Sequence, residues 1–64
     1  MKWTEVRDIA IELSEKHPTV DPKTIRFIDL HNLIVDLENF DDDHQRGGEK
    51  VLEAIQAAWI DEVE

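Results

Sequence analysis

Residues 21–43 read DPKTIRFIDLHNLIVDLENFDDD, and this stretch decides how the rest of the chain is arranged. It opens with the turn signal Asp21-Pro22, passes through a short segment rich in β-branched and aromatic residues, and continues as an amphipathic pattern. Between Phe27 and Gln45 there are six acidic residues and no Lys or Arg. The apolar spacing predicts a core-forming helix, and the excess of acid needs its own explanation.

Apolar residues spaced for one helical face predict three helices. The first is expected to run from a Thr4 cap to His17-Pro18, because proline disfavours the helical conformation of the residue before it. The second is expected to begin with Asp29 as its cap, and the third is expected to begin at Glu49. The predicted core side chains come from these helices and the segments beside them: Trp3, Val6, Ile9, Leu13, Ile25, Phe27, Leu30, Leu33, Ile34, Leu37, Phe40, Leu52, Ile55 and Trp59.

The segments between the helices carry turn and strand signals. Residues 24–27 predict a short strand, and residues 39–48 predict a loop that ends in Gly47-Gly48. Adjacent glycines suggest positive backbone φ angles and a mobile segment. Residues 1–64 are therefore expected to form one mainly α domain, winged-helix-like, with three helices and a short extended segment between the first two.

Charge and composition narrow the function. Seven basic and sixteen acidic residues give a net charge of −9, which disfavours binding to nucleic acid and to anionic membranes. Cations remain as partners, either a metal ion or a basic protein surface. The absence of cysteine excludes disulfides and thiolate chemistry. The longest apolar runs are too short to span a bilayer and no signal peptide is recognisable, so a cytoplasmic location is predicted.

Clustered carboxylates on two predicted helix faces suggest weak metal binding. One face carries Glu5, Asp8 and Glu12, and the other carries Asp29 and Asp36. Carboxylates suit hard or borderline cations such as Fe²⁺, but an exposed cluster binds weakly. The alternative is that these faces are solvated and only keep the protein soluble. A calcium-loop frame starting at Asp42 fails, because its third and fifth positions are not oxygen ligands.

A docking surface for a basic protein is the second interpretation of the same faces. Ile11 and Val35 are apolar residues just beyond the acidic faces, and an acidic rim around exposed apolar residues is typical of such surfaces. The predicted partner-binding residues are Glu5, Asp8, Ile11, Glu12, Val35, Asp36, Asp41, Asp42 and Asp43.

The remaining candidates for chemistry favour structural roles. His31 is expected to be partly buried and hydrogen-bonded to the backbone, and Trp3 and Trp59 are expected in the core. No nucleophile–base arrangement, phosphate-binding loop or paired carboxylates in a pocket can be recognised. The sequence therefore predicts a protein that is not an enzyme.

The order of short motifs resembles the IscX family of small acidic proteins of bacterial iron–sulphur cluster assembly. These motifs are Lys2-Trp3-Thr4, Asp21 through Phe27, Asp29-Leu30-His31, Asp36-Leu37, Phe40 through Asp43, Leu52 through Ile55, Trp59 and Asp61-Glu62. The chain departs from the family pattern at Ile28, where a threonine is usual, and at Leu33, where an aromatic residue is usual.

This resemblance implies a winged-helix-like fold, binding to the cysteine desulfurase of the pathway, and weak binding of ferrous iron by surface carboxylates. It implies an iron donor or a modulator of the desulfurase, without a tightly bound cofactor, and a monomer is expected. The alternative from another class is an acidic winged-helix protein that mimics nucleic acid and occupies a basic partner.

Overall fold

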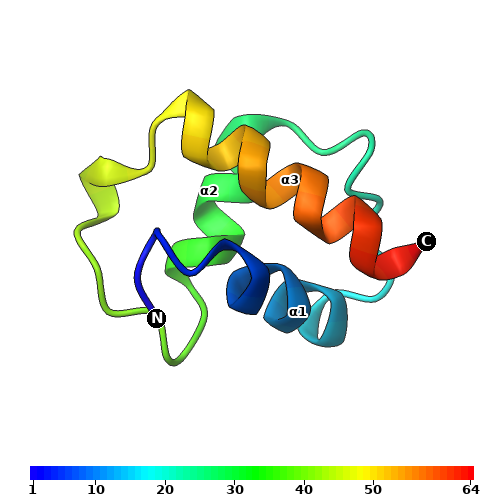
Figure 1. The fold of residues 1–64 in the computed structure, drawn as a ribbon, viewed down its shortest axis with the longest axis horizontal. Coiled ribbons are helices and arrows are strands. Elements are labelled where there is room, and N and C mark those ends of the chain that lie inside the picture. The colour runs from blue at the N-terminus through cyan, green and yellow to red at the C-terminus, as the bar shows by residue number, and fades with distance from the viewer.

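Three α-helices and one short 3-10 helix make up the computed structural model, which describes residues 1–64. The helices are α1 (Val6–Lys16), α2 (Phe27–Val35) and α3 (Glu49–Val63), and the 3-10 helix η1 spans His44–Arg46. α1 packs most extensively on α3, and α2 contacts both. Figure 1 shows α1 and α3 crossing the view side by side, with α2 steeply inclined to both. The prediction of three helices is confirmed.

The core forms where the three helices meet. Its buried apolar side chains are Trp3, Ile9, Ala10, Leu13, Leu30, Ile34, Leu37, Leu52, Ile55 and Trp59, of which all but Ala10 were predicted. The other predicted core residues, such as Val6 and Phe40, are partly buried around this cluster. The predictions that Trp3 and Trp59 belong to the core are confirmed, and the indole N–H of Trp59 has no hydrogen-bond partner.

The strand predicted at residues 24–27 is wrong, because the structure contains no strands and hence nothing for such a segment to pair with. Arg26 has extended backbone angles, but it serves as the cap of α2. The structure therefore confirms a small, mainly helical domain but does not confirm the winged-helix description. The turn expected at Asp21-Pro22 is present, since the Asp21 carboxylate accepts the backbone N–H of Lys23 at 2.9 Å.

Two predicted helix caps are also wrong. α1 begins after Glu5 instead of Thr4, and the Glu5 side chain bends back to accept the backbone N–H of Lys2 at 2.7 Å. α2 begins two residues before Asp29, because the Leu30 N–H already donates to the Arg26 carbonyl at 2.9 Å. Asp29 lies in the first turn, where a carboxylate is favoured by the helix dipole.

The glycine pair has a different role from the one predicted. Neither Gly47 nor Gly48 has a positive φ angle. A Cβ atom at Gly47 would lie 2.6 Å from two carbon atoms of the Trp3 ring and 2.9 Å from His31 Cδ2. Gly47 is therefore required by the close approach of Trp3, whereas a Cβ at Gly48 would meet nothing within 4 Å.

Candidate functional site

A shallow pocket lies between the acidic face of α1 and the amino terminus. Asp8, Ile11 and Glu12 line this open pocket of about 260 Å³ together with Met1 and Asn39. The Asn39 side-chain amide donates to Glu12 at 3.4 Å, and no basic side chain pairs with Asp8 or Glu12. Three of the predicted partner-binding residues thus converge on one hollow. Glu5 is not part of its lining.

The acidic residues of α2 do not form one cluster. Asp29 forms an exposed ion pair with Arg26 at 3.3 Å, while Asp36 is the cap at the other end of the helix. Seven residues separate them, which corresponds to about 10 Å along the helix axis. Val35, the apolar residue expected beside Asp36, is partly buried against the core.

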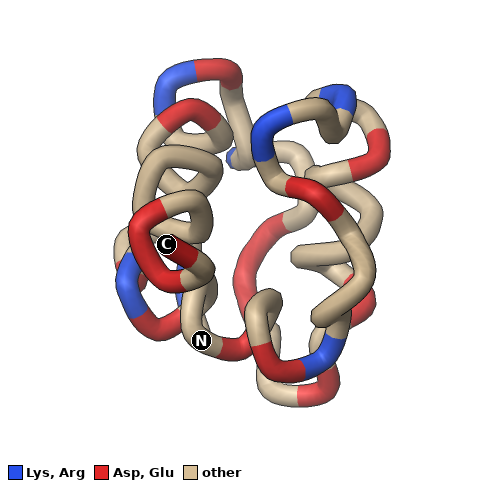
Figure 2. The backbone as a smooth tube through the Cα atoms, turned by 90° about the vertical axis from the view of Figure 1, so that its right-hand side faces the viewer, with Lys and Arg blue, Asp and Glu red and all other residues tan.

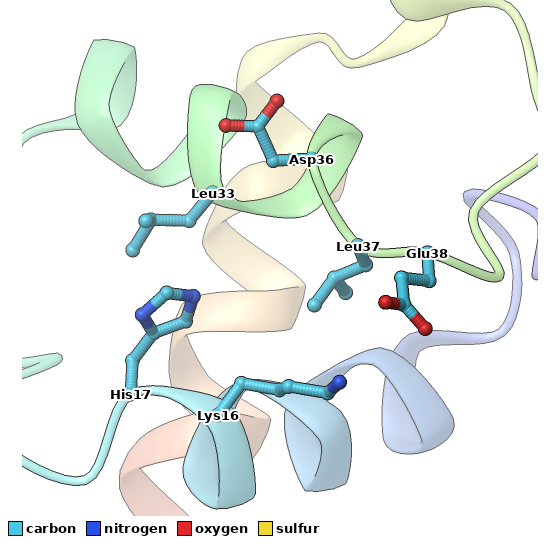
Figure 3. Close-up of a pocket in the computed structure, with 6 residues that line it drawn as sticks. All are labelled: Lys16, His17, Leu33, Asp36, Leu37 and Glu38. Carbon is cyan, nitrogen blue, oxygen red and sulfur yellow. The ribbon is translucent and has the colours of Figure 1, made fainter.

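Asp36 lies instead at a second pocket, of about 270 Å³, between the end of α1 and the segment that follows α2. It is lined by Lys16, His17, Leu33, Asp36, Leu37 and Glu38. Figure 3 shows His17 rising from the end of α1 toward Leu33, while Lys16 extends sideways below Leu37 on the side of Glu38 and the Asp36 carboxylate points away from them. Sequence reasoning missed this pocket because its two sides are about twenty residues apart and no local pattern joins them.

The carboxylates predicted to bind a metal are not gathered into a chelating site. The structure brings no three His, Asp or Glu side chains together in a way that could hold a metal ion. Asp8 and Glu12 share the α1 pocket, and Glu5, Asp29 and Asp36 lie elsewhere. Weak iron binding remains a prediction that this geometry does not test.

The aspartates 41–43 are occupied within the chain. Asp41 pairs with the amino terminus at 2.9 Å and with Lys2 at 3.4 Å, and Asp42 accepts the backbone N–H of Trp3 at 3.0 Å. Asp43 caps η1 by accepting the Gln45 N–H at 3.0 Å, and its carbonyl accepts the Trp3 indole N–H at 2.7 Å. These residues were predicted to contact a partner, and in this conformation they hold the amino-terminal segment.

These contacts favour the charged forms of two of the carboxylates. The pKa of Asp41 is held below its ordinary value of 3.8, chiefly by the hydrogen bond from the amino terminus and further by Lys2. The pKa of Asp42 is lowered first by the backbone N–H groups of Trp3 and Asp43, with smaller contributions from nearby basic side chains. Both side chains are therefore stabilised as anions by internal donors.

His31 takes the structural role expected of it. Its ring is partly buried, and Nε2 lies 2.7 Å from the His44 carbonyl oxygen. The ring also packs near Trp3, with 5.5 Å between the ring centroids. The prediction of a partly buried histidine bonded to the backbone is confirmed.

Most of the acidic residues have no basic partner. Ion pairs with basic groups involve only four of the sixteen, namely Asp29, Asp41, Glu62 and Glu64. Figure 2 shows Asp and Glu on all sides of the molecule, with Lys and Arg at few places. None of the helices combines the length and apolar character needed to cross a bilayer.

Comparison with known proteins agrees with the resemblance seen in the motifs. The iron–sulphur cluster assembly family matches residues 1–64. The uncharacterized protein PA3808 of Pseudomonas aeruginosa is 60% identical over 62 residues, which cover 97% of this chain and 94% of that protein. Neither finding supports a nucleic-acid mimic. The chain belongs to the iron–sulphur cluster assembly family that IscX represents.

Proposed function

We propose that this protein is a non-catalytic adaptor of iron–sulphur cluster assembly that binds a basic surface of the cysteine desulfurase. The observation that carries the proposal is the α1 pocket, which is lined by the exposed Asp8 and the partly exposed Glu12 beside Ile11, and neither acid has a basic partner. A Lys or Arg side chain fits such a place, because its methylene stem packs on an apolar residue while its charged end meets carboxylates. A cytoplasmic location is part of the proposal.

Asp36 and Val35 extend the proposed docking surface to the end of α2. Long-range attraction between the acidic protein and a basic partner accelerates their encounter and is screened over about 8 Å at physiological ionic strength. Binding is therefore expected to weaken as salt is raised.

Charge reversal at the α1 pocket tests the docking surface. The double variant Asp8→Lys, Glu12→Lys should lose roughly tenfold or more of its affinity for the desulfurase, measured by calorimetry at physiological salt. The matched control is Glu53→Lys, Asp61→Lys on α3, which changes the net charge equally at two exposed acids without ion pairs. Equal losses in both variants would show that only net charge matters and would refute a docking surface on α1.

Weak binding of ferrous iron is the second part of the proposal. Its support is the chemistry of the carboxylates, since Asp and Glu oxygens suit Fe²⁺ and Asp8 and Glu12 line one pocket. Titration with Fe²⁺ under anaerobic conditions should broaden or shift the backbone NMR signals of Glu5, Asp8, Glu12, Asp29 and Asp36 before others. Uniform broadening over the whole chain would leave docking as the only role of these acids.

A desulfurase assay separates iron donation from regulation. Sulphide production is measured with and without this protein at two iron concentrations. An effect that depends on iron supports a donor, whereas an effect equal at both concentrations supports a modulator. The absence of any effect, together with no binding by calorimetry, would contradict the adaptor itself.

A further inference from the structure

The two pockets of this structure lie next to each other along α1. Asp8, Glu12 and Lys16 follow one another at intervals of four residues, so they form a row along the helix. The first two line the α1 pocket, whereas Lys16 belongs to the second pocket, called the leucine pocket below, which is lined by Lys16, His17, Leu33, Asp36, Leu37 and Glu38. The consecutive residues Glu38 and Asn39 line the leucine pocket and the α1 pocket, respectively. A bound segment that fills one pocket therefore reaches the other.

The leucine pocket offers different chemistry from the α1 pocket. Its apolar surface comes from Leu33 and Leu37, with the His17 ring rising toward Leu33 and Lys16 extending below Leu37 (Figure 3). The Lys16 ammonium group has no ion-pair partner in the chain. An apolar side chain placed here packs on the two leucines and on the methylene stem of Lys16. The leucine pocket therefore suits an aliphatic side chain.

The charges around the leucine pocket disfavour a basic side chain inside it. Of the two carboxylates in its lining, that of Asp36 points away from the leucines and that of Glu38 lies on the side of Lys16 (Figure 3). The positive charge of Lys16 offsets the attraction of Glu38 for another cation. In the α1 pocket, by contrast, no basic side chain opposes Asp8 and Glu12. The two adjoining pockets thus favour different side chains, a basic one at the α1 acids and an apolar one at the leucines.

We propose that the leucine pocket binds an apolar side chain of the same partner segment whose basic side chain occupies the α1 pocket. The basic contact is that of the proposed function, on which this inference rests, and the apolar contact is new. Asp8 and Lys16 lie eight residues apart, which corresponds to about 12 Å along the helix axis. About four extended residues cover this distance. The partner segment therefore carries a lysine or arginine and, about three positions away, an aliphatic residue.

Two short peptides, blocked at both ends, test this preference without the desulfurase or iron. The leucine peptide reads Lys-Ser-Ser-Leu, and the lysine peptide, Lys-Ser-Ser-Lys, replaces the apolar end by a second positive charge. Binding is followed at physiological salt by the backbone NMR shifts of residues 8–12 for the α1 pocket and of residues 33–38 for the leucine pocket. If net charge alone decided the affinity, the lysine peptide would bind more tightly, because the protein carries a net charge of −9.

The leucine peptide should shift the signals of both pockets and bind the wild type with roughly threefold or greater affinity than the lysine peptide, because its side chain is removed from water. Lys16→Glu replaces the opposing charge by an attracting one, so the preference for the leucine peptide should fall by roughly fivefold or more. Lys50→Glu on α3 is the matched control, since Lys50 is exposed, forms no ion pair and lines neither pocket. It changes the net charge equally and should leave the preference unchanged.

The outcomes that contradict this inference can be told apart from a failure of the proposed function. A wild type that prefers the lysine peptide, or equal changes of preference in Lys16→Glu and Lys50→Glu, would overturn the apolar contact. So would the absence of shifts at residues 33–38 with the leucine peptide. In each of these cases, shifts at residues 8–12 would leave the docking surface on α1 intact. No shifts at residues 8–12 with either peptide would overturn that surface together with this inference.

Discussion

Replacing Gly47 by alanine perturbs the contact between Trp3 and the loop in a way that the structure makes quantitative. The added Cβ would lie 2.6 Å from two carbon atoms of the Trp3 ring, whereas ordinary van der Waals contact begins at 3.4 Å. Gly47 has a φ angle of −78°, which alanine adopts without strain. The effect of the substitution is therefore steric, and the ring must move by about 0.8 Å to relieve it.

The expected loss of stability follows from two opposing contributions. Inserting a methyl group into a well-packed contact costs about 1–3 kcal/mol. Replacing glycine by alanine lowers the entropy of the unfolded chain and returns about 0.4–1 kcal/mol. The net destabilisation is then about 1–2 kcal/mol, which is large for a chain of this length, whose total stability is expected at about 3–10 kcal/mol.

Urea unfolding followed by circular dichroism measures this difference, with Gly48→Ala as the matched control. The open space at Gly48 and its φ angle of −77° leave only the entropic gain, so the control should be as stable as the wild type or slightly more stable. The Gly47→Ala variant should have a lower urea midpoint, and in a thermal melt its melting temperature should fall by roughly 4–8 °C for each kcal/mol lost. If the Gly47→Ala protein is as stable as Gly48→Ala, the close contact between Gly47 and the Trp3 ring is refuted.

Three further predictions concern pH, the core and salt. The pKa of Asp42 is lower in the folded protein than its ordinary value of 3.8, so the charged Asp42 side chain stabilises the fold at neutral pH and this stabilisation is lost as the pH falls below 3.8. Protection of the Trp3 backbone N–H against hydrogen exchange should fall in the same range. Asp42→Asn should remove this pH dependence. Leu30 is fully buried, so Leu30→Ala should cost about 2–5 kcal/mol by calorimetry; a smaller loss would mean that the core closes over the cavity. Added salt should raise the urea midpoint of the isolated protein, because it screens the repulsion of a net charge of −9, and a lower midpoint would contradict this.

The helices and the core could be predicted because their signals are local and repetitive. Ile9, Leu13, Leu30 and Ile34 follow the spacing of one helical face, and burial of that face decides the packing whatever the loops do. The break after α1 was equally predictable from Pro18. These features need only the chain itself and the periodicity of a helix.

Features that depend on a partner elsewhere in the chain could not be predicted. Residues 24–27 have the composition of a strand, but a strand needs a neighbour, and none exists in this fold. In the sequence, Gly47 suggests only a flexible backbone. In the structure a glycine is needed there because the Trp3 ring, from over forty residues earlier, leaves no room for a Cβ atom. The pocket at Lys16 and Asp36 likewise exists only because two helix ends meet.

The acidic residues illustrate the same limit in the candidate site. Sequence alone treats Asp41–Asp43 and the α1 acids as one negative surface, since charge and exposure are the only criteria available. The structure separates them by their hydrogen bonds: Asp42 is bonded to backbone N–H groups, while Asp8 and Glu12 have no basic partner. A carboxylate that already accepts internal hydrogen bonds has fewer free acceptor positions to offer a cation. We therefore expect a basic partner to make its most favourable first contact at the α1 pocket.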